Sequence, residues 1–104
     1  MTPHVELPKD KIEAFCHTWK VVELALFGSV LRDDFGPDSD VDVLVTFADD
    51  ARWGLLDHAR MERELAAIIG RDVDLVTRSA VERSPNWIRR REILDGARSL
   101  YAAR

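Results

Sequence analysis

Hydrophobic and polar positions in the first third of the chain predict a helix, a strand and a second, shorter helix. Apolar residues recur at helical spacing over residues 9–20, which predicts an amphipathic helix. The apolar, β-rich run Val21–Phe27 ends at Gly28 and predicts the first strand. Ser29 is a favourable N-cap residue, so a short helix is expected to follow it and to end near residue 34.

The same alternation continues through the rest of the chain. Valines alternate with polar and mixed residues from 41 to 46, which predicts a strand with one apolar face. The elements expected after it are a helix over about 54–69 with Gly70 as its C-cap, a strand at 73–76, a helical region at 79–94 interrupted near Pro85, a turn at Asp95-Gly96 and a short strand at 99–102.

This order of elements indicates the fold class. Alternating helices and strands imply an α/β (α+β) fold, in which helices pack against a small mixed β-sheet. The length of 104 residues suits one compact domain, residues 1–104, rather than two. No internal repeat, low-complexity segment or linker interrupts it.

Composition narrows the setting in which the chain works. Cys16 lies among apolar residues and is expected to be a small core residue, because a single cysteine forms no internal disulfide. The first ten residues do not resemble a secretory signal, and the longest apolar stretch, 21–31, is too short to span a bilayer. The expected location is the cytoplasm, without a membrane partner.

Charge is distributed unevenly along the chain. The net charge is −4, which argues against direct binding of nucleic acid. Residues 33–50 contain seven aspartates and no Lys or Arg, whereas arginines outnumber acidic residues from Arg78 onward. Such a pattern suggests a cation site beside an anionic partner or substrate, although charge alone leaves ordinary solvated surface as the alternative.

The clearest chemical signal combines Gly28 and Ser29 with Asp40 and Asp42. A glycine lets the backbone approach a phosphate without a Cβ in the way, and a serine adds a hydroxyl donor. Aspartates two apart on a strand share one face, where their mutual repulsion favours a divalent cation. Mg²⁺ suits such a site because it binds between carboxylates and substrate phosphates. Ten residues separate Ser29 from Asp40.

Together these residues resemble the signature of the polymerase-β-like nucleotidyltransferase superfamily, which is Gly-Ser, ten residues and Asp-x-Asp. The chain is similar to its minimal nucleotidyltransferase branch, whose members add an Arg after Gly-Ser, a Ser before Asp-x-Asp and a distant Val-Asp-Leu-Val. The matching residues here are Gly28, Ser29, Arg32, Ser39, Asp40, Asp42, Val73, Asp74, Leu75 and Val76. The ending at 96–101 also resembles that branch, so the similarity covers nearly the whole chain.

The resemblance implies a polymerase-β-like fold and a role for each matched residue. Asp40 and Asp42 would hold two Mg²⁺ ions, as in two-metal sites generally. Asp74 would complete the metal site and orient or deprotonate the attacking hydroxyl. Gly28 and Ser29 would hold the β- and γ-phosphates of ATP. Arg32 would pair either with phosphate or with an acidic residue of the cluster.

One position departs from the family pattern, and a second leaves the choice of the third metal ligand ambiguous. Many members have Gly after the motif arginine, where this chain has Asp33, which helix geometry is expected to turn outward. Asp72 lies two residues before Asp74 and faces the same way along a strand, so it competes for the third metal position. Asp74 is preferred because apolar residues flank it and the family motif places it there.

The resemblance also implies a partner. The chain has no room for a second domain that would bind an acceptor, which disfavours a stand-alone small-molecule adenylyltransferase. In the minimal branch the resemblance implies a common partner, a HEPN-domain ribonuclease toxin, to whose tyrosine hydroxyl the transferase moves AMP from ATP as an antitoxin, and this activity is expected here. The alternative is a binding antitoxin that occludes its toxin without catalysis.

One further pattern is interpreted as accidental. Arg52 and His58 have the spacing of a HEPN ribonuclease motif, but HEPN domains are all-helical and this chain is not. His58 shares a helix face with apolar residues and is expected at the edge of the core. Trp19 is predicted to be buried, and Trp53 and Trp87 are predicted to lie near loops.

Overall fold

The computed structural model describes residues 7–31, residue 36 and residues 39–103. Its elements are the helix α1 (Lys9–Thr18), the strand β1 (Val21–Phe27), the 3₁₀ helix η1 (Gly28–Leu31), β2 (Val41–Phe47), α2 (Leu55–Ile69), β3 (Val73–Thr77), α3 (Arg78–Glu82), α4 (Trp87–Gly96) and β4 (Arg98–Ala102). Every helix and strand that the pattern predicts is therefore present.

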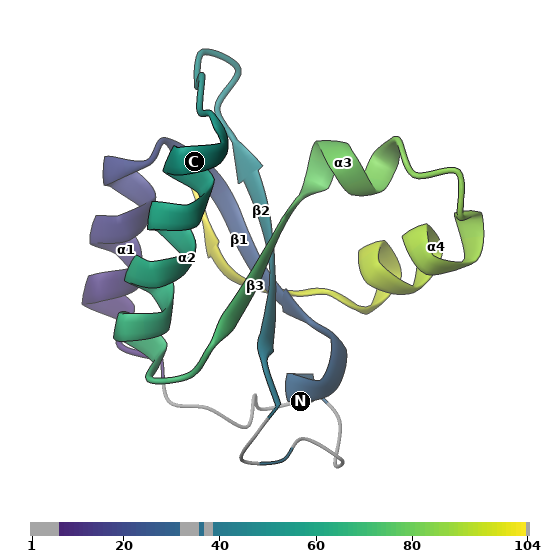
Figure 1. The fold of residues 1–104 in the computed structure, drawn as a ribbon, viewed down its shortest axis with the longest axis horizontal. Coiled ribbons are helices and arrows are strands. Elements are labelled where there is room, and N and C mark those ends of the chain that lie inside the picture. The colour runs from purple at the N-terminus through teal and green to yellow at the C-terminus, as the bar shows by residue number, and fades with distance from the viewer. Residues whose placement is uncertain (1–6, 32–35, 37–38, 104) are drawn as a thin grey trace.

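The described strands form one sheet in the order β3-β2-β1-β4. Strand β1 runs antiparallel to both β2 and β4, whereas β2 and β3 are parallel. This confirms the predicted small mixed sheet. Figure 1 shows α1 and α2 on one side of the sheet and α3 and α4 on the other.

The face covered by α1 and α2 holds the main core. Its buried residues are Ile12, Phe15, Cys16, Trp19, Val21, Leu24, Leu26, Leu31, Val41, Val43, Val45, Met61, Leu65 and Leu75. The three β2 valines point to this face, because alternate residues of a strand share a side. Burial of Trp19 and Cys16 confirms their predicted places in the core.

The opposite face holds a minor core of Ala25, Phe27, Leu44, Val81 and Ile93. Helices α3 and α4 supply one buried residue each, so they cover this face less completely than α1 and α2 cover the other. Pro85 lies between the two helices, as the interruption of the helical pattern predicts. Asp42, Leu44 and Thr46 point to this face, opposite the β2 valines.

Two local expectations differ from the structure. The helix after β1 begins at Gly28, so Ser29 lies inside η1 rather than in front of it, and the described part of η1 ends at Leu31. Asp95 and Gly96 do not form a turn between strands. Helix α4 continues through both residues and ends at Gly96, two residues beyond the helical region expected at 79–94.

In the described part of the chain, no helix is both long enough and apolar enough to cross a membrane.

Candidate active site

Strand register brings Asp42 and Asp74 together. Asp42 of β2 is the register partner of Asp74 on the parallel strand β3. Neighbouring strands lie about 4.8 Å apart, and partners in register point to the same face. Here that face carries the minor core. Asp42 is partly buried and Asp74 is exposed, so the pair lies at the surface of the sheet where solvent can reach it.

Gly28 lies directly against the Asp42 carboxylate. It follows Phe27, which is the β1 register partner of Asp42, and its φ of +78° lies in the left-handed region that favours glycine. A Cβ at this position would overlap Oδ2 of Asp42 and would lie 3.3 Å from its Cγ. The structure therefore leaves no room for a side chain at Gly28 while Asp42 keeps its position.

Asp40 lies just before β2, and its backbone neighbours are held on both sides. The Arg71 guanidinium donates to the carbonyl oxygens of Gly36 and Ser39, at 2.5 and 2.8 Å. The Val41 amide donates to the Asp72 carbonyl at 2.8 Å. These contacts tie the approach to β2 to the connection between α2 and β3. No sequence motif singles out Arg71 for this task.

Asp72 and Asp74 occupy different places. Asp74 lies within β3 beside Asp42, whereas Asp72 precedes the strand and offers its backbone carbonyl to β2. This placement favours Asp74 over Asp72 as the partner of Asp42. The predicted Arg32 and the neighbouring Asp33 lie outside the described residues, and for Ser29 only the backbone is described.

The donor set fits a hard cation only in part. Carboxylate oxygens are the ligands that Mg²⁺ prefers, and strand register places two of them side by side. Over the described residues, however, no three His, Cys, Asp or Glu side chains are gathered as ligands of one ion. Asp40 is exposed ahead of the strand. The complete metal set of Asp40, Asp42 and Asp74 therefore stays a prediction.

Helix α2 fastens the edge strand β3 next to Asp74. Oε2 of Glu62 accepts a hydrogen bond from the Leu75 amide at 2.8 Å, and Nε2 of His58 lies 2.8 Å from the Leu75 carbonyl oxygen. These backbone groups lie at the edge that no described strand pairs with, so the two side chains satisfy them. His58 is partly buried, as predicted, while Arg52 bonds to the carbonyl oxygens of Asp49 and Ala51.

A pocket of about 210 Å³ lies beside Gly28 and Asp42. Phe27, Gly28 and Asp42 line one part of it, and Arg89, Glu92 and Ile93 of α4 line the rest. Neither Arg89 nor Glu92 was predicted to belong to the site, because no motif links them to Gly28. The only local signal was the run of arginines at 89–91.

Comparison with known proteins defines the class to which this fold and site belong. The sequence profile of the nucleotidyltransferase domain family matches residues 9–100. The chain belongs to this family, which confirms the nucleotidyltransferase predicted from the sequence.

Its relatives include protein adenylyltransferases. The chain is 31% identical to a candidate protein adenylyltransferase of Methanocaldococcus jannaschii over 78 residues, which cover 75% of this chain and 71% of that protein. It is 40% identical to the protein adenylyltransferase MntA of Thermococcus cleftensis over 62 residues, which cover 60% of this chain and 61% of that protein. The second match thus spans less than two thirds of the relative.

Solved structures confirm the predicted fold. The chain superposes on a chain of a toxin–antitoxin complex with AMP-PNP at a TM-score of 0.69 and 22% identity, covering 94% of this chain and 76% of the other. It also matches a complex of tri-AMPylated Shewanella oneidensis HEPN toxin with MNT antitoxin, at a TM-score of 0.61 and 24% identity, covering 91% and 70%. At these identities the likeness concerns the fold.

Proposed function

We propose that this chain is a Mg²⁺-dependent antitoxin that transfers AMP from ATP to a tyrosine hydroxyl of a cognate HEPN ribonuclease toxin. The observation that carries the proposal is the alignment of Asp42 with Asp74, with Gly28 against the Asp42 carboxylate. The relatives named as protein adenylyltransferases and the toxin–antitoxin structures support it.

The residues of the chain have separate tasks in this transfer. The tyrosine oxygen bonds to the α-phosphorus of ATP, the bond from that phosphorus to the bridging oxygen breaks, and pyrophosphate leaves. Asp74 is exposed, so it can orient the incoming hydroxyl and take its proton. Gly28 exposes its backbone to the outer phosphates, and the Ser29 hydroxyl would donate to them.

Mg²⁺ held by Asp40, Asp42 and Asp74 would neutralise phosphate charge during the transfer. Without a cation, the aspartates would repel a triphosphate.

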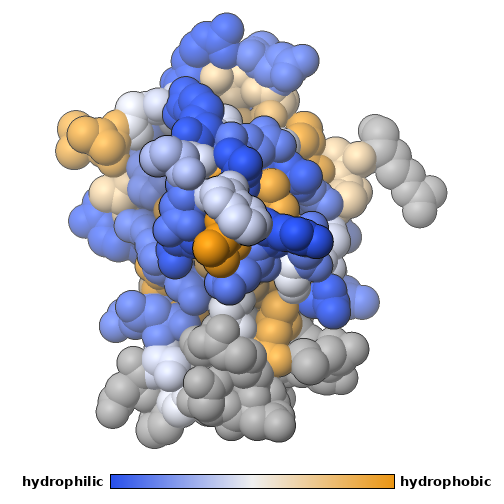
Figure 2. Space-filling view, turned by 90° about the vertical axis from the view of Figure 1, so that its right-hand side faces the viewer, coloured by the Kyte–Doolittle hydropathy of each residue, from blue (hydrophilic) through white to orange (hydrophobic). Residues whose placement is uncertain are grey.

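The protein acceptor needs a docking surface beside this site. Trp87 and Ile88, at the start of α4, are 59% and 54% exposed. Exposed aromatic residues are frequent anchors of protein interfaces. Figure 2 shows that the side of the molecule with α3 and α4 is mainly hydrophilic around a small hydrophobic area. We propose that Trp87 and Ile88 contact the toxin while its tyrosine reaches Asp74.

The decisive experiment separates catalytic from stoichiometric neutralisation. The toxin is co-expressed with the wild-type chain or with the Asp40→Ala plus Asp42→Ala variant, and its intact mass is measured. The wild type should add AMP to the toxin, whereas the variant should bind the toxin without modifying it and protect cells poorly. Asp10→Ala plus Asp49→Ala, at exposed positions away from the site, is the matched control.

A binding antitoxin gives a different result. If the active-site variant protects cells fully at equal expression and the wild type adds no nucleotide to the toxin, then neutralisation is by occlusion and the proposed transfer is wrong.

A further inference from the structure

We propose that Arg89 of α4 belongs to the nucleotide site and binds a phosphate of the nucleoside triphosphate. This inference rests on the proposed function, because it assigns a further residue to the same site. It starts from the pocket beside Gly28 and Asp42, whose other wall comes from α4. No sequence motif includes that helix, so only the fold brings Arg89 to the site.

The N-cap of α4 and a buried residue one turn later fix the backbone position of Arg89. The Asn86 side chain caps α4 by accepting a hydrogen bond from the Arg89 amide at 3.1 Å. One turn later, Ile93 is buried in the minor core and anchors the helix to the sheet. Residues four apart share a helix face. Arg89 and Ile93 therefore line the pocket together.

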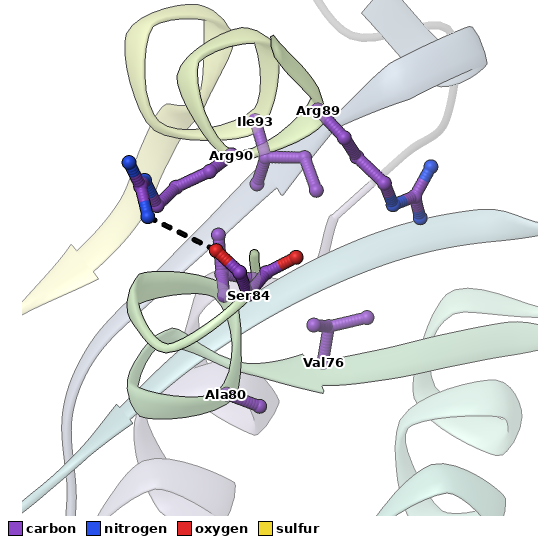
Figure 3. A pocket seen from close by; sticks show the side chains of 7 residues that line it. Val76, Ala80, Ser84, Arg89, Arg90 and Ile93 are labelled. Atoms are coloured by element: carbon purple, nitrogen blue, oxygen red, sulfur yellow. Dashed lines mark hydrogen bonds between the residues drawn. The ribbon is translucent and has the colours of Figure 1, made fainter. Parts of the chain in front are cut away.

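The three consecutive arginines of α4 have different surroundings. Arg90 donates to the Ser84 carbonyl oxygen at 3.0 Å, and Arg91 forms an exposed ion pair with Asp95 at 3.4 Å. Within the described part of the chain, the Arg89 side chain makes no hydrogen bond or ion pair. Figure 3 shows Arg89 and Arg90 extending from α4 in different directions, with Arg90 reaching Ser84.

Charge and size agree with a phosphate as the ligand. Arginine presents a planar fork of donors that matches two phosphate oxygens, and such charge-assisted bonds are the stronger kind. Of the described residues that line the pocket, Arg89 alone is cationic, and the carboxylates of Asp42 and Glu92 lie beside it, so a phosphate would be held there between Arg89 and the proposed cation at Asp42. At about 210 Å³ the pocket is smaller than a typical site for a whole drug-sized ligand, which suits part of a nucleotide.

The test measures nucleotide binding by the full chain without toxin. Titration calorimetry with AMP-PNP and Mg²⁺ compares the wild type with Arg89→Gln, Arg89→Lys and Arg91→Gln. Arg89→Gln should weaken binding about tenfold, since a charge-assisted bond is lost. Arg89→Lys should weaken it less, because the charge remains without the fork. Arg91→Gln removes the same charge from the same helix and should bind like the wild type.

Each other outcome has a definite meaning. If the wild type binds AMP-PNP and both Arg89 variants bind it equally well, Arg89 is not in the nucleotide site and the proposed function stands. A pull-down of the toxin with the same variants is the second measurement: if Arg89→Gln leaves AMP-PNP binding unchanged but weakens capture of the toxin, the residue is a docking contact and this inference is wrong. If the wild type binds no nucleotide with Mg²⁺ or Mn²⁺, the proposed function itself fails. Should Arg89→Gln prove unfolded by circular dichroism, Arg89→Lys decides.

Discussion

The two faces of the sheet differ in how much of them the helices bury. Among the described residues, the main core under α1 and α2 contains fourteen buried residues, and the minor core under α3 and α4 contains five. Gly28, Asp42 and Asp74 all belong to the thinly covered side, together with the pocket at Arg89. One face thus supplies most of the hydrophobic stabilisation, and the other carries the residues of the proposed active site.

This division has a physical reason. A carboxylate that is buried without a partner loses far more hydration energy than most side chains can return, so it needs water or a cation. Asp42 and Asp74 keep contact with solvent on the open face. The backbone of Asp42 is nevertheless held in place, because β2 lies between two strands and its valines are buried in the main core, and α2 bonds to β3 next to Asp74. The face under α1 and α2, the dense face, therefore holds in position the face under α3 and α4, the open face.

The largest expected effect is the loss of stability when a residue of the main core is truncated. Leu65 of α2 is 0% exposed, and Leu65→Ala should lower the free energy of unfolding by about 3–4 kcal/mol through lost burial and the cavity left behind. Ile93→Ala should lower it by only about 2 kcal/mol, because Ile93 already borders two pockets that are open to water. Guanidinium unfolding measures both. Equal losses would show that the faces contribute alike to stability.

The next effect concerns ligand binding at the open face. In the wild type, AMP-PNP with Mg²⁺ at a hundred times its Kd should stabilise the fold by about 2.7 kcal/mol. Asp42→Asn should abolish this gain, because a carboxylate of the proposed metal site is lost. Without ligand the variant should keep its fold, because the amide has nearly the same shape as the carboxylate and removes the repulsion with Asp74.

Thermal unfolding with and without the nucleotide checks this prediction. Asp49→Asn, at an exposed position after β2, should keep the full ligand response and serves as the control. If Asp42→Asn kept the ligand response, Asp42 would not be a ligand of the proposed metal ion.

A smaller effect is expected at Gly28, and the chain offers a matched control. Gly28 and Gly70 have φ angles of +78° and +81°. A Cβ at Gly70 meets nothing within 4 Å, so Gly70→Ala should lose only about 1 kcal/mol through backbone strain. Gly28→Ala adds the clash with the Asp42 carboxylate and should lose about 2 kcal/mol.

Gly28→Ala should also lose its nucleotide response, whereas Gly70→Ala should retain it. Unfolding free energies and AMP-PNP titrations of both variants measure the difference. If the two variants behave alike, the contact between Gly28 and Asp42 has no role in the site.

Sequence patterns predicted most of this architecture because the relevant signals are local. Burial of alternate valines marks β2, helical spacing marks α1 and α2, and the left-handed φ of Gly70 ends α2 as predicted. The motif also named Gly28, Asp42 and Asp74, which the register then placed together.

What the sequence did not predict depends on contacts between distant segments. Arg71 and Arg89 reach the site from positions that no spacing rule connects to Asp42, and the pairing of Glu62 with the Leu75 amide depends on how α2 packs. Helix η1 begins at Gly28, before the N-cap that was expected at Ser29. The turn expected at residues 95–96 is absent, because α4 continues through both residues and ends at Gly96.

The smallest effect at neutral pH concerns the interior of the dense face. Burial, with a smaller contribution from Glu13, raises the pKa of Cys16 from 9.0 to about 12. Because the folded pKa is raised, this group's contribution to stability is fully present below pH 9 and is lost as pH rises from 9 towards 12. Above pH 9 the unfolded chain releases the thiol proton while the folded chain retains it, so the free energy of unfolding falls with a limiting slope of about 1.4 kcal/mol per pH unit.

Unfolding free energies measured from about pH 7 to about pH 10.5 should therefore fall more steeply for the wild type than for Cys16→Ala, since all other titrating groups are common to both. Parallel curves would mean that the thiol ionises as readily in the folded chain as in the unfolded chain. The main core would then tolerate a charged group, which was expected only on the open face.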